Sequence, residues 1–298
     1  MVKVGIVLEK LSQLDLKKFD RVIDIVVDCL PNKDNDSAND EIVLLLNEKI
    51  RNSEFLELIL GDLYGKFRDI LTRNNKFLTH VNVFFNKDDK NEYDDILDSQ
   101  IIYIPRIELK PLFSHTKEVR IFDLPLIELP ELSNKPISPD MNKYQISAIG
   151  GTFDHLHDGH KILLSVAAFL TTQRLVVGVT DQELLKNKKF KEVLQSYEFR
   201  CKYVTEFLRK IKPSLKVEIY PLRDVCGPTL KFEEIQCLLI SKETLKGSKI
   251  VNDARVAKGM SELEIYIVDV LGGDEHNNWQ EKLSSTSIRQ KLIELREK

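Results

Sequence analysis

The sequence predicts an α/β protein in which a smaller α/β domain precedes a doubly wound, five-stranded parallel sheet. In the second half, five β-rich runs alternate strictly with helix-like segments, and such alternation produces parallel strands joined by crossover helices. The first 110 residues show a shorter alternation of the same kind. With 298 residues, of which 42% are hydrophobic, the chain can form two domains, each with its own core.

The first domain is expected over residues 1–110. Its expected strands are 2–8, 42–46 and 81–85, its helices are 16–29 and 53–71, and a polar loop covers 31–40. This domain contains neither a G-x-G-x-x-G nor a G-x-x-x-x-G-K-[ST] phosphate loop. The sequence therefore assigns it no chemistry, and a scaffold or assembly role is the expectation.

Residues 111–142 are expected to be an extended connection between the domains. Prolines at this density prevent continuous helices and central strands. The prolines in and beside this stretch are Pro105, Pro111, Pro125, Pro130, Pro136 and Pro139.

The second domain is expected over residues 143–298. Its expected strands are 144–149, 174–179, 216–220, 237–240 and 264–270, and its helices begin near Asp158, Asp181, Ser196, Thr229, Ser248 and Ser285. In an open α/β sheet, ligands bind in the crevice at the carboxyl ends of the strands. We therefore expect the ligand-binding residues in the loops that follow these strands.

The first of these loops predicts an anion site. Gly150 and Gly151 end a strand, and a helix follows with His157 and His160 one turn apart. Helix N-termini present backbone N–H groups and a positive dipole end to anions. Gly159, between the histidines, allows a ligand to approach the backbone.

Several later residues are weaker candidates for ligand binding, and each of them could instead have a purely structural role. Lys186 is the first choice for a lysine that closes over phosphates and Lys188 the second, although such basic clusters are more often solvated. Arg200 is expected either on the surface or facing a phosphate. Lys242 follows the fourth strand, and Asp224 belongs to the loop after the third, where turn formation is equally expected.

A second anion-binding element is predicted near residue 285. Small hydroxyl residues begin a terminal helix there, and Arg289 lies on the next turn. As an N-cap alone this would be unremarkable. Together with the first loop, it indicates a polyphosphate held between two helix N-termini, with donors from Ser285, Thr286 and Ser287.

These two elements resemble motifs of the H-x-G-H nucleotidylyltransferase superfamily, namely Gly151-Thr152-Phe153-Asp154 with His157-x-Gly159-His160, and Ser284-Ser285-Thr286-x-Ile288-Arg289. Leu283 stands where that superfamily usually has isoleucine. Shorter runs, 163–167, 175–179, 211–215 and 241–244, resemble the eukaryotic branch of the phosphopantetheine adenylyltransferases. The resemblance covers about residues 144–298. It implies transfer of the adenylyl group of ATP to 4′-phosphopantetheine, which gives dephospho-coenzyme A and pyrophosphate in coenzyme A biosynthesis.

The resemblance also implies roles for individual residues. His160 would donate to the α-phosphate in the transition state, Thr152 would bind near the phosphoryl group under attack, and Lys186 would contact the reacting phosphates. His157, with Gly151, Phe153 and Gly159, would help to bind ATP, and Arg289 would support the β- and γ-phosphates. Mg²⁺ would be held mainly by the ATP phosphates, because the sequence shows no carboxylate cage for it.

Two other functions remain as alternatives. A cytidylyltransferase acting on an alcohol phosphate such as phosphocholine shares the G-x-F-D and H-x-G-H elements, and a non-catalytic nucleotide-binding scaffold is also conceivable. Bacterial adenylyltransferases of this kind carry arginine-glycine where this chain has Lys242-Glu243, which leaves the pantetheine contacts open.

Composition limits the expected partners and cellular location of the protein. The net charge of −3 argues against a broad polyanion-binding surface, so no nucleic-acid partner is expected. The four cysteines form no C-x-x-C pair, and no apolar run approaches the ~20 residues of a membrane helix. A cytoplasmic protein is therefore expected, with other coenzyme A pathway enzymes as candidate partners of the first domain.

Overall fold

A computed structural model describes residues 2–31, 40–87, 98–113, 116–127, 138–186, 188–268 and 284–296. The chain divides into two compact units, Met1–Arg51 with Leu58–Ser138 and Asn52–Glu57 with Pro139–Lys298. Parts of the expected polar loop and connection, Leu283 and the end of the last expected strand lie outside the described residues.

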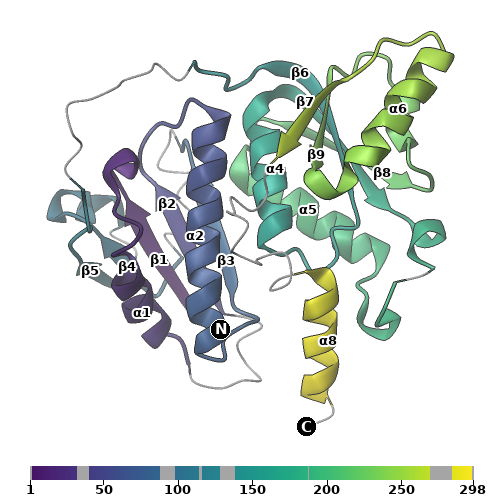
Figure 1. The fold of residues 1–298 in the computed structure, drawn as a ribbon. Coiled ribbons are helices and arrows are strands. Elements are labelled where there is room, and N and C mark those ends of the chain that lie inside the picture. Colours follow the sequence, from purple (N-terminus) through teal and green to yellow (C-terminus); the bar gives the residue numbers. More distant parts are fainter. Residues whose placement is uncertain are drawn as a thin grey trace. The chain divides into compact units, whose positions relative to one another are not determined.

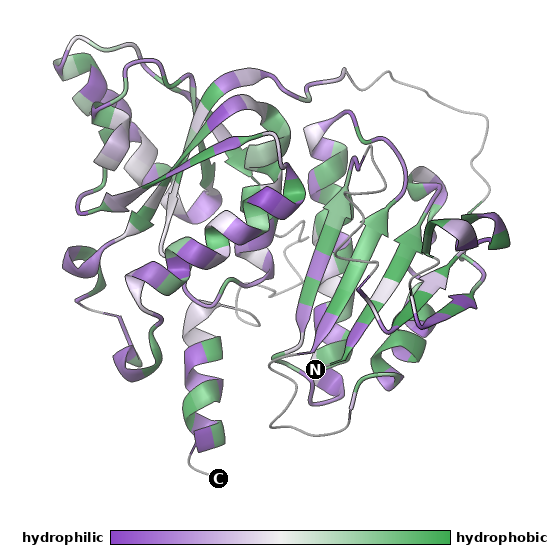
Figure 2. Ribbon diagram, turned by 180° about the vertical axis from the view of Figure 1, so that it is seen from behind, coloured by the Kyte–Doolittle hydropathy of each residue, from purple (hydrophilic) through white to green (hydrophobic). Residues whose placement is uncertain are grey.

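The first unit is a five-stranded parallel sheet in the order β3-β2-β1-β4-β5. Apolar runs that are buried along almost their whole length form its central strands, and Figure 2 shows these strands coloured as hydrophobic. The helices α1 and α2 lie on one face of the sheet (Figure 1). The elements are β1 (Lys3–Leu8), α1 (Asp20–Asp28), β2 (Glu41–Leu46), α2 (Ser53–Arg73), β3 (His80–Phe85), β4 (Ile101–Ile104), η4 (Ile107–Phe113) and β5 (Glu118–Ile121).

The second unit is also a five-stranded parallel sheet, in the order β10-β9-β6-β7-β8. The helix α4 is buried on nearly all sides, which explains why its sequence is apolar around the whole circumference. The elements are β6 (Tyr144–Gly151), α4 (Asp158–Leu170), β7 (Thr171–Thr180), η5 (Gln182–Leu185), η6 (Lys191–Val193), α5 (Tyr197–Ile211), β8 (Lys216–Leu222), η7 (Gly227–Leu230), β9 (Cys237–Ser241), η8 (Lys242–Thr244), α6 (Leu245–Ala257), β10 (Glu264–Val268) and α8 (Ser285–Arg296).

The two sheets have the same strand order. In each unit the first strand lies between the second and the fourth, so the order reverses beside β1 in one sheet and beside β6 in the other. Such a switch point opens a crevice at the carboxyl ends of the strands. In the first unit, polar side chains meet at this place: Glu9 accepts from Arg106 Nε and Nη2 at 2.7 and 2.9 Å and from Asn47 Nδ2 at 2.9 Å.

The predicted fold class is confirmed, with three local differences. The strand β5 lies inside the stretch expected to be a connection, because an edge strand tolerates prolines on either side of it. β4 was not among the expected strands. The helices expected near Asp181 and Thr229 are single 3₁₀ turns, η5 and η7, since each is followed within a few residues by another turn or strand.

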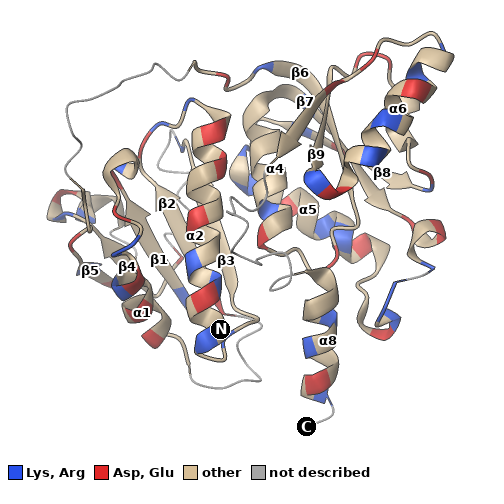
Figure 3. Cartoon of the chain, in the orientation of Figure 1, with Lys and Arg blue, Asp and Glu red and all other residues tan. Residues whose placement is uncertain are grey.

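Charged residues of both signs occur along α2, α6 and α8 (Figure 3). The four cysteines are all free. None of the helices in the described part of the chain combines the length and the apolar character that crossing a bilayer requires.

Candidate active site

The candidate site begins where β6 ends, between β7 and β9. The turn between β6 and α4 has two non-glycine residues with left-handed backbone, Phe153 at φ 51° and His155 at φ 45°. Such conformations cost free energy and persist where the surroundings impose them. The buried Phe153 ring lies over Gly151, so closely that a Cβ atom there would stand 3.0 Å from the ring. A side chain at position 151 would therefore force the Phe153 ring to shift.

His157 and His160 lie together at the start of α4. His157 is the N-cap residue of the helix, and the two imidazole rings stack with centroids 3.7 Å apart and planes 25° apart. The centroid of the Phe153 ring lies 5.3 Å from that of the His160 ring, with the two ring planes tilted by 57°. The expected pairing of the two histidines on one helical turn is therefore present.

The electrostatics of the site keep His160 neutral. Burial, the neighbouring His157 and the charge of Lys188 together lower the pKa of His160 well below 6.5. His160 Nδ1 is buried and has no hydrogen-bond partner among the described residues, although the residue as a whole is partly exposed. A neutral imidazole can still donate one N–H to a ligand oxygen.

Arg200 stabilises the turn between β6 and α4 through backbone carbonyl groups. Its side chain is 1% exposed, and Nη1 donates to the carbonyl oxygens of Thr152 at 2.7 Å and Thr180 at 2.9 Å. Nε donates to the carbonyl of Gln195 at 3.2 Å. This position differs from the expected surface or phosphate-facing one, because the guanidinium satisfies carbonyl groups at the ends of β6 and β7.

Gln195 was not a candidate, yet it connects to the same turn. Its Oε1 accepts from the His155 N–H at 2.8 Å, and its own N–H donates to Asp154 Oδ1 at 3.0 Å. His155 Nε2 bonds the carbonyl of Val193 at 2.8 Å. Nothing near Gln195 in the sequence indicates these partners, which come from about 40 residues away.

The predicted second helix N-terminus joins the same site. Ser284 and Ser287 cap α8 reciprocally, since the Ser284 N–H donates to Ser287 Oγ at 2.8 Å and the Ser287 N–H donates to Ser284 Oγ at 3.1 Å. Ser285 Oγ donates to the carbonyl oxygen of Asp154 at 2.9 Å. The start of α8 therefore contacts the turn that leads into α4.

Arg289 is buried next to the contact between the start of α8 and the turn before α4. It is 1% exposed, and its Nη1 forms an ion pair with Asp154, which is 0% exposed. Its Nε donates to the carbonyl of Lys189 at 3.0 Å and its Nη2 to Thr286 Oγ1 at 3.1 Å. The resemblance implied a contact of Arg289 with phosphates, whereas here the guanidinium is engaged inside the protein.

The weaker candidates lie in different surroundings. Lys186 and Lys188 are both exposed, and of the two it is Lys188 whose charge acts on His160. Lys242 is exposed in η8, after β9. Asp224 Oδ1 accepts from the N–H groups of Cys226 at 2.9 Å and Gly227 at 2.7 Å, so its side chain shapes the turn after β8.

Three glycines, in β6, β7 and η7, accommodate a single leucine. Leu222, the last residue of β8, lies against Gly150 of β6 and Gly178 of β7. A Cβ atom on Gly178 would stand 2.6 Å from the Leu222 side chain, and one on Gly227, at φ +46°, would stand 2.2 Å from it. Side chains at Gly178 or Gly227 would displace Leu222 from this position near the carboxyl ends of the strands.

The site therefore presents two helix N-termini, a neutral histidine and several hydroxyl groups to one place. That set of groups suits a phosphate-bearing ligand whose charge changes during a reaction. Within the described ranges, no group of three or more His, Cys, Asp or Glu side chains could hold a metal ion.

Comparison with known proteins identifies the class of the second unit and then the family of the chain. Residues 148–291 match the cytidylyltransferase-like family model, so the second unit is a nucleotidylyltransferase domain. The phosphopantetheine adenylyltransferase of Saccharomyces cerevisiae is 41% identical over 260 residues, which cover 85% of this chain and 83% of that protein. The chain therefore belongs to the phosphopantetheine adenylyltransferase family.

Two further similarities are confined to about half of the chain. The phosphopantetheine adenylyltransferase of Pyrococcus abyssi is 34% identical over 154 residues, 52% of this chain and 94% of that protein. A crystal structure of a protein of unknown function from Archaeoglobus fulgidus aligns with 45% of this chain and 95% of its own, at 25% identity and a TM-score of 0.38.

Proposed function

We propose that the protein transfers the adenylyl group of ATP to 4′-phosphopantetheine, giving dephospho-coenzyme A and pyrophosphate. The observation that carries this proposal is the 41% identity to the yeast phosphopantetheine adenylyltransferase over 85% of the chain. The arrangement of two helix N-termini beside the His157–His160 pair supports it, because a triphosphate needs donors at more than one phosphate.

The reaction needs no general base. A phosphate monoester has a second pKa of about 6 and is largely dianionic at neutral pH. One of its oxygens attacks the α-phosphorus of ATP, a new phosphorus–oxygen bond forms, and the bond from the α-phosphorus to the bridging oxygen of pyrophosphate breaks. The protein then has to position the two phosphates and stabilise charge on the phosphoryl oxygens.

We assign to His160 the stabilisation of negative charge on the α-phosphate oxygens in the transition state. Its lowered pKa keeps the imidazole neutral, so one ring nitrogen carries a hydrogen that it can donate to an α-phosphate oxygen. Thr152 lies at the start of the turn that leads into α4, where Arg200 fixes its carbonyl. Lys188, whose charge reaches His160, and Lys186 are the candidates for closing over the phosphates.

The start of α8 would receive the β- and γ-phosphates through the Thr286 hydroxyl and free backbone N–H groups of its first turn, since the hydroxyl hydrogens of Ser285 and Ser287 are donated inside the protein. Mg²⁺ bound to these phosphates would neutralise the leaving pyrophosphate. Because no cluster of metal-binding side chains occurs in the described ranges, we propose that the ion arrives with ATP and is held mainly by its phosphates. Loss of pyrophosphate release in EDTA, restored by added Mg²⁺, tests this part.

Pyrophosphate release distinguishes the proposed function from its alternatives. The purified chain is assayed with ATP or CTP, each against 4′-phosphopantetheine and phosphocholine. Release only with ATP and phosphopantetheine, with dephospho-coenzyme A as the second product, is the expected result. Release only with CTP and phosphocholine would make the protein a cytidylyltransferase, and no release with any pair would leave a nucleotide-binding scaffold.

We further propose that the first unit binds other enzymes of the same pathway in the cytosol. The alignment with the yeast protein extends over 260 residues, more than the 148–291 span of the catalytic family model, so it includes part of the first unit. Ile25 on α1 and Ile121 on β5 are exposed apolar residues that a partner could cover. Pull-downs with the full chain and with Ile25→Lys and Ile121→Lys variants test this; equal recovery of pathway enzymes by all three counts against these contacts.

A further inference from the structure

Arg289 connects three segments that are distant in the sequence. Nη1 pairs with Asp154 in the turn before α4, Nε donates to the carbonyl of Lys189 in the loop after β7, and Nη2 donates to Thr286 in the first turn of α8. Each nitrogen of the guanidinium therefore serves a different segment. Arginine alone presents donors in such a fixed planar fork.

Asp154 completes the connection from the other side. Besides the ion pair with Arg289, its Oδ1 accepts from the Gln195 N–H at 3.0 Å. Its backbone carbonyl accepts from Ser285 Oγ at 2.9 Å. The turn before α4 and the start of α8 are thus joined both through side chains and through the backbone of Asp154.

The hydroxyl groups at the start of α8 differ in how their hydrogens are used. Ser285 donates its hydroxyl hydrogen to Asp154, and Ser287 donates its own to the carbonyl of Ser284 at 2.8 Å. Thr286 Oγ1, in contrast, accepts from Arg289. No acceptor for the Thr286 hydroxyl hydrogen lies among the described residues. An oxygen whose lone pair is engaged in this way keeps its O–H for a ligand.

We propose that Arg289 is a positioning residue, which holds the start of α8 against the turn before α4 through Asp154 and orients the Thr286 hydroxyl toward a phosphate oxygen. This inference rests on the proposed function, since it concerns how that function's phosphates are bound. The guanidinium is 1% exposed and has three partners inside the protein. A direct phosphate contact would have to break that arrangement.

Two double-mutant cycles test the proposal by adenylyl transfer from ATP to phosphopantetheine. The first combines Arg289→Gln with Thr286→Val, and the second combines Arg289→Gln with Asp154→Asn. If Arg289 acts through its partners, each single substitution lowers kcat by about tenfold or more while the KM for ATP changes less, as for interactions that matter mainly in the transition state. Each double variant then stays close to its slower single variant.

The proposal would be overturned if the effects of the two substitutions in each cycle simply multiplied in the double variant. A direct phosphate contact of Arg289 predicts that Arg289→Gln raises the KM for ATP, that Thr286→Val lowers activity by the same factor in both backgrounds, and that Asp154→Asn leaves ATP binding unchanged. The double variant Asp154→Asn with Arg289→Gln contains no unpaired buried charge, so it remains interpretable if a single variant folds poorly.

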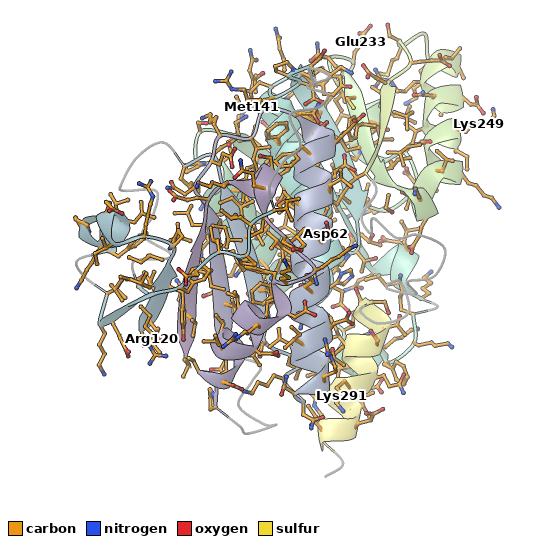
Figure 4. The ribbon with its side chains drawn as sticks, turned by 60° about the vertical axis from the view of Figure 1, so that its left-hand side comes forward. Asp62, Arg120, Met141, Glu233, Lys249 and Lys291 are labelled. Atoms are coloured by element: carbon orange, nitrogen blue, oxygen red, sulfur yellow. The ribbon has the colours of Figure 1, made fainter. Side chains whose placement is uncertain are left out.

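Arg255→Gln is the matched control for removal of a buried arginine. Arg255 is 0% exposed, and its guanidinium donates to the carbonyls of Thr229, Glu233 and Ser261. It belongs to α6, in the region marked by Glu233 and Lys249 in Figure 4, whereas Lys291 marks α8 at the opposite end of the unit. Arg255→Gln should lower thermal stability while the folded fraction keeps its kcat.

The test separates this inference from the proposed function. Adenylyl transfer by the wild-type chain establishes the function whatever the variants do. If the wild-type chain is inactive, hydrogen exchange of the full chain still tests the positioning role. Asp154→Asn and Arg289→Gln should both speed exchange in residues 284–289 and in the turn 151–157, and unchanged exchange in both segments would overturn the proposal.

Discussion

The imidazole rings of His157 and His160 stack face to face, with centroids 3.7 Å apart. Two protonated rings at this separation would repel each other, and the surroundings of His160 are largely buried. Both effects lower the pKa of His160, burial being the larger. His160 is therefore neutral near pH 7, and its proposed contribution to phosphate binding would come from N–H donation.

The lowered pKa should be visible by NMR of the histidine rings. The Cε1 resonance of His160, assigned by its disappearance in His160→Gln, should stay constant as pH falls from 7.5 to about 6, through the range in which an unperturbed histidine titrates. Since the unfolded chain binds a proton at this residue near pH 6.5, the fold loses stability from His160 as pH falls below that value. A His160 pKa at or above 6.5 would contradict the prediction.

Replacement of His160 by alanine should reduce turnover by about 10²-fold or more, with a modest change in ATP affinity. The reason is that its N–H is assigned to charge that develops in the transition state, and loss of one such donor typically has this size. Steady-state kinetics and direct ATP titration measure the two effects separately. Near-normal turnover would remove His160 from the mechanism.

Gly151→Ala should lower kcat by about tenfold or more. The added Cβ would stand 3.0 Å from the ring of Phe153, and that ring is fully buried and packs against His160. A small displacement of a catalytic group is costly because reaction depends on alignment. Combining Gly151→Ala with Phe153→Leu, which shortens the side chain, should recover part of the loss; an unchanged kcat in Gly151→Ala would show that the turn adapts freely.

Gly178→Ala should destabilise the second unit by about 1–3 kcal/mol, the usual cost of overpacking. The new methyl group would lie 2.6 Å from Cγ and Cδ2 of Leu222, and Cγ cannot move away without the whole side chain. In a Leu222→Ala background the same substitution should cost much less. Calorimetry of the full chain measures both. The control is Gly247→Ala in α6, where the methyl group would meet Val225 at an ordinary 3.5 Å.

Much of the fold followed from local patterns. The expected strands of both units coincide closely with β1, β2, β3 and β6 to β10, because continuous apolar runs bounded by polar turns identify buried parallel strands. β5 was missed for a physical reason: it is a short edge strand with two exposed residues among four, and nearby prolines are compatible with such an edge. Arg120 on β5 is labelled in Figure 4.

In the candidate site, too, local features were predictable from the sequence and long-range contacts were not. The pairing of His157 and His160 on one helical turn and the start of a helix near Ser285 depend on residues within one turn, so the sequence predicts them; the N-cap position of His157 and the reciprocal caps of Ser284 and Ser287 are added by the structure. The buried positions of Arg200 and Arg289 depend on carbonyl groups and a carboxylate from other strands and loops. No local pattern distinguishes such an arginine from one that faces a ligand.

The contact between Asp154 and Arg289 spans 135 positions of the chain, and this separation has a consequence for protein synthesis. During synthesis, β1 to β10 and the turn before α4 are all made before α8. Until Arg289 emerges, Asp154 has no arginine partner and the hydroxyl groups of α8 are absent. A chain synthesised only as far as residue 283 therefore lacks both the arginine partner of Asp154 and the second helix N-terminus of the site, and it should not transfer adenylyl groups.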